Sequence, residues 1–418
     1  MKQNLEIQIE NIGKQAQAAS RALAVLSSTV KNTVLKDMAI ALLGNQAIIL
    51  KANQKDISKS LGKNKAFIDR LSLNAARIKQ MADSLLAIAK LKDPVGEVIR
   101  AWNTVSGLSI QKVRAPIGVI AIIYESRPNV TSDCIGLGFK SGNSVILRGG
   151  SQALNSNLAI FDVLKQVLQK HHLAEGAINL IATANRKAVD YLLKLNNYID
   201  LVIPRGGEEL IKKVVRVSAI PVIKHYKGIC HVYVDEGADL NMAQNICFNA
   251  KCQRPGVCNA MESMLVHRDV AARFLPGMLK KFKESKVEIR GCAFTRKIAS
   301  WAKRATAKDY RTEYSDLILS VKVVEDLDAA IAHINEYGSH HSDSIVTDNN
   351  FAAGKFLKQI DSACVYLNAS TRFTDGNQFG MGAEIGISTD KLHARGPMGL
   401  EELTTYKYMV FGSGQVRT

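Results

Sequence analysis

Four short, almost wholly apolar segments between residues 117 and 207 constrain the fold more than any other feature of the chain. They are IGVIAIIYE (117–125), SVILRGG (144–150), AINLIAT (177–183) and YIDLVIPRGG (198–207), and helical sequence patterns separate them. Strands that alternate with helices at this spacing form βαβ units with right-handed crossovers, and the continuous apolar runs indicate strands buried on both faces. We therefore predict a parallel sheet whose ligand lies at the carboxyl ends of the strands.

The rest of the chain indicates further parts around this sheet. Residues 1 to about 92 are predicted to be helical, and residues 96–116 to form a hairpin that turns near Ser106 and Gly107. A second alternating block starts near residue 228 and predicts a second α/β domain. The C-terminal segment 394–418 alternates again, and its strand could pair with the hairpin or with another subunit.

The charge of the chain raises the question of a polyanionic partner. The sequence contains 55 Lys and Arg residues against 38 Asp and Glu residues, a net charge of +17. Such an excess attracts nucleic acids and small phosphorylated ligands alike. The basic residues are dispersed, without a helix-turn-helix turn or a zinc-finger spacing, so we favour small phosphorylated ligands. A basic nucleic-acid-binding protein stays as an alternative.

The lack of a recognisable export signal and the pattern of the cysteines favour a reducing compartment. No apolar run reaches the roughly 18 residues that a membrane helix needs, and the start, MKQNLEIQIENIGKQ, lacks the apolar block of a signal peptide. The seven cysteines are odd in number and form no Cys-x-x-Cys pair, so we expect reduced thiols. We therefore expect a cytoplasmic protein with no membrane partner and no nucleic-acid partner.

The segment CQRPGVCNAME (252–262) contains the candidate nucleophile. Cys258 follows an Arg-Pro-Gly turn and precedes NAMESMLV, which we interpret as the start of a helix. A thiol at a helix N-terminus is favoured as the thiolate, whereas a buried small hydrophobic residue is the alternative. A metal site formed by Cys247, Cys252 and His341 would require a proximity that the sequence does not show, so we predict no metal.

Two glycine-containing segments could contact a phosphate group. GLGFKSG (136–142) fails the dinucleotide-binding spacing and lies within a predicted helix, so we assign its glycines to packing. In PRGGEELIKKV, Gly206 and Gly207 follow a strand and precede a helix, whose free N–H groups could bind a phosphate; a plain turn is the alternative. Arg148, at the end of the second strand, could pair with the 2′-phosphate of NADP.

The segment EYGSHHSDSIVT (336–347) gathers polar residues beside a predicted strand. His340, His341 and the nearby His333, with Asp343, could bind a carboxylate or a phosphate. They could equally be surface groups that cap the strand, and the sequence leaves both interpretations open.

Four segments closely resemble the gamma-glutamyl phosphate reductase family of the aldehyde dehydrogenase superfamily. They are YESRPNVTSD (124–133), KCQRPGVCNAMESMLVH (251–267), VEDLDAAIAHINEYGSHHSDSIVT (324–347) and FGMGAEIGISTDKLHARGPMGLEELTTYKY (379–408), and the likeness runs nearly end to end. The resemblance implies an α/β, aldehyde-dehydrogenase-like fold with three parts. These are a Rossmann-type cofactor domain (1–96 and 116–226, with 366–394 returning near it), an α/β catalytic domain (227–365) and a small β oligomerisation arm (97–115 and 395–418).

The resemblance also implies an activity in proline biosynthesis, namely NADPH-dependent reduction of L-glutamyl 5-phosphate to L-glutamate 5-semialdehyde with release of phosphate. It implies a thioester on Cys258, with Asn129 and the Cys258 N–H as the oxyanion hole. Glu313 resembles the glutamate that holds the nicotinamide ribose, although the usual Phe-Gly-Pro after it is missing. The candidate substrate-binding residues are Arg127, Lys251, Arg254 and His341. A homo-oligomer is implied, with glutamate 5-kinase as a functional partner.

One departure from the superfamily pattern is informative. Hydrolytic aldehyde dehydrogenases contain a glutamate that activates water against the thioester, and the corresponding stretch here, IKHYKGICHVYV (223–234), contains none. A reductase must keep its thioester until hydride arrives, so a general base would waste the activated acid. An acylating, coenzyme A-dependent semialdehyde dehydrogenase would share these features and stays as the alternative enzyme.

Overall fold

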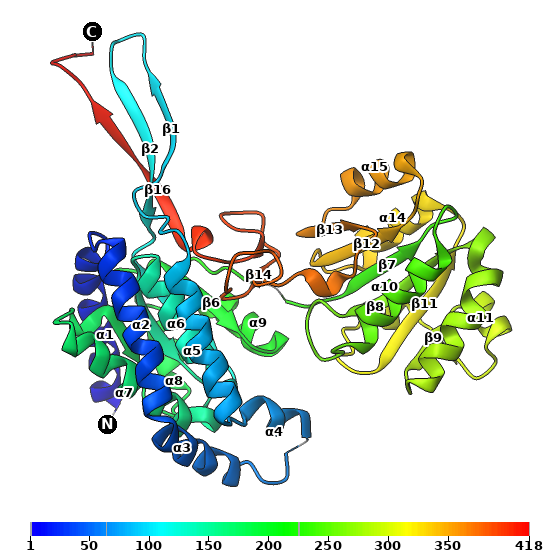
Figure 1. Cartoon of the computed structure of the whole chain (residues 1–418), viewed down its shortest axis with the longest axis horizontal. Helices are drawn as coiled ribbons and strands as arrows, with labels where there is room; N and C mark the ends of the chain where they lie inside the picture. The colour runs from blue at the N-terminus through cyan, green and yellow to red at the C-terminus, as the bar shows by residue number, and fades with distance from the viewer. Residues whose placement is uncertain (1, 64, 225, 418) are drawn as a thin grey trace. The chain divides into compact units, whose positions relative to one another are not determined.

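The computed structural model describes residues 2–63, 65–224 and 226–417, which form two compact units (Figure 1). The first unit comprises Met1–Lys224, Gly380–Gly386 and Met398–Thr418, and the second comprises His225–Phe379 and Ile387–Pro397. Within the segment 366–394, which we expected to return near the cofactor domain, residues Gly380–Gly386 belong to the first unit. The assignment of one unit to the cofactor and the other to catalysis remains a proposal.

The first unit begins with the expected helical region. Its helices are α1 (Lys2–Leu23), α2 (Ser28–Gly44), α3 (Gln46–Ser58), α4 (Lys65–Leu71) and α5 (Ala75–Lys90). The buried residues of α5 recur every three or four positions, so one face of this helix contacts α2 and α6 (Asn129–Lys140). Among the described residues no single helix is long and apolar enough to cross a membrane. Helices α2 and α3, bent by 67° at their junction, reach that length and apolar composition only when taken together.

A four-stranded parallel sheet with the order β5-β4-β3-β6 forms the core of the first unit. The strands β3 (Val119–Tyr124), β4 (Ser144–Arg148), β5 (Ile178–Leu180) and β6 (Leu201–Arg205) coincide with the four apolar segments, which confirms the predicted sheet. The connecting helices are α6, α7 (Leu154–Lys170), α8 (Lys187–Leu192) and α9 (Glu208–Val217), with short 3-10 turns at η1 (Ser151–Ala153) and η2 (Glu175–Ala177). The strand order reverses between β3 and β6, so the loops after these two strands flank the usual ligand crevice of such a sheet.

The first unit also contains an antiparallel sheet of three strands, β1 (Val98–Asn103), β2 (Ser109–Pro116) and β16 (Thr404–Phe411). The predicted hairpin turns at Gly107, whose φ of +82° suits glycine. The C-terminal strand pairs with β2 along its whole length, which confirms the hairpin as its partner. Figure 1 shows these strands as a ribbon that extends away from the helices of the same unit.

The second unit contains a parallel sheet with the order β10-β9-β11-β8-β7-β12-β13. Its strands are β7 (Cys230–Val234), β8 (Met261–His267), β9 (Glu288–Gly291), β10 (Lys303–Arg304), β11 (Ile318–Val324), β12 (Ser342–Val346) and β13 (Cys364–Leu367). Its helices are α10 (Leu240–Cys252), α11 (Arg268–Glu284), α12 (Ala293–Ile298), α13 (Ala307–Tyr310), α14 (Leu327–Tyr337), α15 (Asn350–Gln359) and the 3-10 turn η3 (Thr371–Phe373). Helices α10 and α11 cover one face of the sheet, and α14 and α15 cover the other. A small pair, β14 (Ile387–Ser388) and β15 (Gly396–Pro397), completes the unit.

The prediction of a helix after Cys258 is wrong. Residues Met261–His267 form β8, which lies inside the sheet between β11 and β7 and is buried at every position. Methionine, glutamate and leucine favour helices, but an apolar run of this length cannot distinguish a buried strand from a buried helix. The thiolate of Cys258 is therefore not favoured by a helix dipole, and any stabilisation must come from neighbouring side chains.

The glycines of the GLGFKSG segment pack α6 against its neighbours, as predicted. A Cβ atom on Gly138 would lie 2.2 Å from Cγ1 of Val145 in β4. A Cβ atom on Gly136 would lie 2.6 Å from Cδ2 of Leu85 in α5. These glycines therefore permit close helix packing, and Gly142 ends the helix with a φ of +77°.

Replacing Gly138 with alanine is expected to destabilise the first unit. The added methyl group would collide with a buried valine, and overpacking of this kind costs about 1–3 kcal/mol, more than the roughly 1 kcal/mol that alanine gains over glycine in a helix. Gly44→Ala is the matched control, because no atom lies within 4 Å of its added Cβ. Thermal unfolding should show a lower midpoint for Gly138→Ala and an equal or higher midpoint for Gly44→Ala. Equal midpoints for both variants would contradict the packing role.

Candidate active site

Cys258 lies in the loop between α10 and β8 of the second unit, and its side chain is half-buried. The segment before β7 presses against this loop, because a Cβ atom on Gly228 would lie 1.9 Å from the Cys258 carbonyl oxygen. The thiol of Cys230 donates to the same carbonyl oxygen over 3.2 Å. Two contacts therefore hold the backbone of Cys258, and the residue as a whole is only half-buried.

A buried polar cluster lies behind Cys230. The His341 imidazole Nδ1 lies 3.7 Å from Cys230 Sγ and 2.8 Å from Ser342 Oγ, and Ser342 Oγ lies 2.6 Å from Thr374 Oγ1. Burial raises the pKa of the Cys230 thiol, which therefore stays protonated. His341 has no exposed surface. This placement does not support our expectation of a direct substrate contact; His341 instead supports the strand ends beneath Cys258.

Lys251 also has a structural position. Its ammonium group lies 2.6 Å from the Glu262 carboxylate, and both side chains are completely buried. The Ser315 N–H donates to the second oxygen of Glu262 over 2.9 Å. Burial raises the pKa of Glu262 and lowers that of Lys251, while their mutual attraction opposes both shifts. Lys251 therefore joins α10 to β8 through an ion pair, contrary to its expected role in substrate binding. Glu313, half-buried, lies two residues before Ser315.

Arg372 is a cationic neighbour of Cys258 that the sequence analysis did not identify. It lies in η3, and its Nε donates to the Gln253 side chain over 2.8 Å while its Nη1 donates to the Asn259 side chain. Its charge interacts with that of Cys258 and with that of the exposed Arg254. Arg372 is distant from Cys258 in the sequence and belongs to no recognisable motif, so only the folded chain brings the two together.

Asn129 and Arg127 follow β3 in the first unit, and both side chains are exposed. Asn129 is the first residue of α6, and its Nδ2 donates to Asp133 over 3.3 Å. Ser84 Oγ donates to the other oxygen of Asp133 over 3.0 Å. Burial raises the pKa of Asp133 to about 6, against the effect of these two hydrogen bonds. Asp133 thus orients the Asn129 amide and leaves it open to solvent.

Gly206 and Gly207 lie between β6 and α9, as predicted, but the Gly207 N–H is not free. It donates to the Glu125 carboxylate over 3.1 Å. A Cβ atom on Gly206 would lie 2.7 Å from the Glu125 Cδ atom. The first N–H of this helix therefore binds a carboxylate of its own chain, and a phosphate there would have to displace Glu125.

Arg148 ends β4, and its environment fits an anionic group of a dinucleotide. Its side chain is 8% exposed, Nη1 donates to the Gly149 carbonyl over 2.9 Å, and the buried Nε has no hydrogen-bond partner among the described residues. Burial lowers the pKa of Arg148, and the charge of Arg186 lowers it further. Neither arginine forms an ion pair with a carboxylate in the part of the chain that the structure describes, and an anionic group of a nucleotide could pair with them.

The histidines of residues 333–343 do not form one site. His333 is buried, stacks on Tyr337 and accepts a hydrogen bond from Lys322 over 3.0 Å. Asp343 instead bonds to His231 within the sheet, at 2.8 Å.

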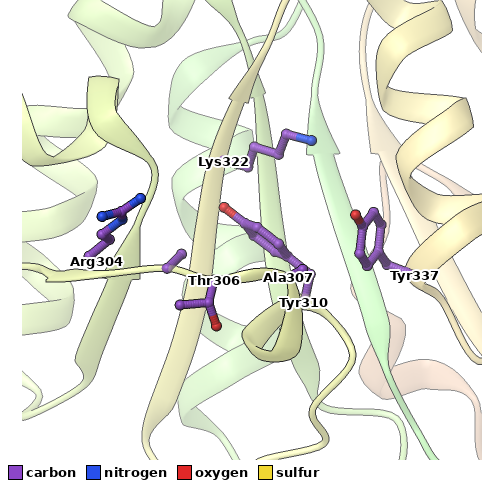
Figure 2. Close-up of a pocket in the computed structure, with 7 residues that line it drawn as sticks. Arg304, Thr306, Ala307, Tyr310, Lys322 and Tyr337 are labelled. Carbon is purple, nitrogen blue, oxygen red and sulfur yellow. The ribbon is translucent and has the colours of Figure 1, made fainter.

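A pocket of about 510 Å³ opens beside His333, and Figure 2 shows Tyr310, Tyr337 and Lys322 around it. None of the predicted site residues lines that pocket. A possible metal-ligand group is formed by Glu236, His267 and Asp269. His267 ends β8, whereas Cys258 precedes that strand, so this group offers no metal to the thiol.

Comparison with known proteins gives a consistent result. The sequence model of the Aldehyde dehydrogenase family matches residues 2–295. A gamma-glutamyl phosphate reductase of Caldanaerobacter subterraneus is 55% identical over 413 residues, which cover 98% of this chain and 100% of that protein. The crystal structure of gamma-glutamyl phosphate reductase from Thermotoga maritima superposes with a TM-score of 0.95 at 47% identity, covering 98% of this chain and 100% of that one.

A more distant structure agrees in fold alone. An acetylating aldehyde dehydrogenase from Geobacillus thermoglucosidasius superposes with a TM-score of 0.71 at 15% identity, covering 99% of this chain and 98% of that one. The predicted aldehyde-dehydrogenase-like α/β fold is therefore confirmed. By sequence and by fold, the chain belongs to the aldehyde dehydrogenase family and, within it, to the gamma-glutamyl phosphate reductases.

Proposed function

We propose that this chain reduces L-glutamyl 5-phosphate to L-glutamate 5-semialdehyde with NADPH, through a thioester on Cys258. The observation that supports this most strongly is the placement of Cys258. Its thiol is half-buried beside the arginine Arg372, in a chain that is 55% identical, nearly end to end, to a protein named for this reaction. Positive charge beside a thiol favours the thiolate, which is the attacking species.

The reaction begins when the Cys258 thiolate attacks the acyl carbon of the mixed anhydride. The sulfur–carbon bond forms, the bond from carbon to the phosphate oxygen breaks, and phosphate leaves with the electron pair. Phosphate is a good leaving group, so this step needs no strong general acid. NADPH, when bound, supplies the hydride that reduces the thioester carbon.

The oxyanion that forms at each stage requires hydrogen-bond donors. The Cys258 N–H donates no hydrogen bond to any residue that the structure describes, so it is available for this purpose. We propose the Asn129 amide as the second donor. Removing one such donor costs about 3–4 kcal/mol of transition-state stabilisation in comparable sites.

The thioester must also resist water, and one carboxylate near the site is held in place. Glu262 interacts electrostatically with Cys230, next to the nucleophile. One of its oxygens binds the Lys251 ammonium and the other accepts the Ser315 N–H. The Glu262 side chain is completely buried and both of its oxygens are occupied, so it has no position from which to activate a water molecule against the thioester.

The residues proposed for cofactor binding lie in both units. Arg148, with Arg186 close by, would hold the 2′-phosphate of NADPH, because neither arginine pairs with a carboxylate of the described residues and the buried Arg148 Nε has no partner there. Glu313 would hold the nicotinamide ribose, and the loop at Gly206 and Gly207 would approach the diphosphate. We further propose a homo-oligomer assembled through the β1-β2-β16 ribbon, with Arg127 and Arg254 contributing to substrate binding.

The activity can be tested in reverse with glutamate 5-semialdehyde, NADP⁺ and inorganic phosphate. We expect NADPH formation that requires phosphate, measured by absorbance, and a loss of at least about 10³-fold in Cys258→Ser. Cys252→Ser is the matched control and should retain activity, since that thiol lies at the end of α10 and burial raises its pKa. Turnover that depends on coenzyme A in place of phosphate would support the acylating alternative instead.

Asn129→Ala is expected to lower kcat by about 10²–10³-fold with a small change in KM, because the lost donor acts on the transition state. The exposed Asn197 of the same unit provides the control variant Asn197→Ala. Steady-state kinetics of both variants would show whether the loss of kcat is specific to Asn129. A wild-type kcat in Asn129→Ala would rule out an oxyanion role for this residue.

Gly228→Ala is expected to displace Cys258 and to lower kcat by about 10²-fold, the usual effect of a shift of about 1 Å at a reacting group. The new methyl group would overlap the Cys258 carbonyl oxygen, 1.9 Å away. In the control Gly237→Ala the nearest atom lies 3.4 Å from the new Cβ. Circular dichroism should show a retained fold for both variants, and kinetics should show lost activity for Gly228→Ala alone. Full activity in Gly228→Ala would contradict the close contact.

A further inference from the structure

Arg372 bridges the loop that contains the nucleophile. Gln253, which accepts from Nε, lies at the start of that loop, and Asn259, which accepts from Nη1, directly follows Cys258. Asn259 is itself fixed, because its Nδ2 donates to the Thr374 carbonyl over 2.8 Å. The guanidinium group is therefore held at a defined place against the residue that follows Cys258, and this orientation exists before substrate binds.

The bonds of Arg372 leave part of its guanidinium group unused. Its two side-chain acceptors are neutral amides, and its Nη2 has no hydrogen-bond partner within residues 2–63, 65–224 and 226–417. No carboxylate of those residues forms an ion pair with it. Burial lowers the pKa of Arg372, and the charge of Arg254 adds to this effect. The charge of Asp375 attracts Arg372 without forming an ion pair with it. A half-buried cation with unused donors and no directly bonded carboxylate is a site for an anion.

The chemistry of the substrate identifies that anion. In an acyl phosphate, the phosphate oxygen is bonded to the same carbon that the sulfur attacks. The α-carboxylate of the glutamyl group, in contrast, is separated from that carbon by three further carbon atoms. A guanidinium whose charge interacts with the sulfur is therefore placed for the phosphate.

We propose that Arg372 is the residue that binds the phosphoryl group of the acyl phosphate and holds the phosphate as it leaves the acyl carbon that Cys258 attacks. This inference rests on the proposed function and adds the residue that recognises the leaving group. When the sulfur–carbon bond forms, the carbon–oxygen bond breaks and the electron pair stays on the phosphate oxygen. Arg372 donates hydrogen bonds to the phosphate and transfers no proton, because a guanidinium keeps its proton at any physiological pH. In the reverse reaction it binds inorganic phosphate for attack on the thioester.

The first experiment measures the thiol directly and needs no turnover. The full-length protein is treated with iodoacetamide at several pH values and phosphate concentrations, and alkylation of Cys258 is followed by peptide mass spectrometry. In the wild type, inorganic phosphate should slow alkylation in a saturable manner. In Arg372→Ala and Arg372→Gln, half-maximal protection should require about 10–100-fold more phosphate, and alkylation without phosphate should be slower.

Two further variants separate charge from geometry. Arg372→Lys keeps the charge but loses the planar fork, so it should restore the rate of alkylation without phosphate more than the protection by phosphate. Arg273→Ala, which removes an exposed arginine of α11, should behave as the wild type in both measurements. Wild-type protection and a wild-type rate of alkylation without phosphate in Arg372→Gln would overturn the proposal.

Steady-state kinetics in the reverse direction provide the second test. Arg372→Ala should raise the KM for phosphate by about 10–100-fold and change the KM for the semialdehyde little. The opposite pattern would mean that Arg372 binds the carboxylate, and the proposal would be wrong. If the wild type shows no turnover while phosphate still protects Cys258 through Arg372, the proposed function fails but the phosphate site stands.

Discussion

Burial of both parallel sheets on both faces is the constraint on which the rest of the structure depends. Every residue of β3, β4, β7 and β8 is buried, so the interior of each sheet offers no surface to a substrate. Chemistry is confined to the loops at the strand ends. Asn129 follows β3, the Gly206–Gly207 pair follows β6 and Cys258 precedes β8. The strands also hold these loops rigidly, because the ladder hydrogen bonds and the packed faces leave little freedom at their ends.

Charge around Cys258 is arranged before a substrate arrives. The negative charge of Glu262 is neutralised by Lys251 inside the unit, whereas the positive charge of Arg372 is not matched by an ion pair in the described chain. The buried pair thus contributes no net charge, and the local excess is positive. That excess favours the thiolate and attracts an anionic substrate, and fixed charges need little reorganisation during the reaction. The net charge of +17 acts over a longer range in the same direction.

Sequence patterns predicted the architecture well and the environment of the nucleophile poorly. The four strands of the first sheet, the hairpin and the pairing of its C-terminal strand are confirmed, because apolar runs and turn residues report local burial and local geometry. The residues after Cys258 form a strand and not a helix, because their propensities conflict with their place inside a sheet. Lys251 and His341, which we expected to bind substrate, are both completely buried, and no local pattern distinguishes a buried charge from an exposed one.

By itself, the sequence determined the two α/β blocks and the β1-β2 hairpin, since apolar runs and turn residues report local burial and local geometry. Only the tertiary structure decided which charged groups are free. The Gly207 N–H binds Glu125, Lys251 binds Glu262, and Arg372 keeps unused donors beside Cys258. Whether a charge is paired depends on segments that are distant along the chain and adjacent after folding, and no local pattern records such a distance.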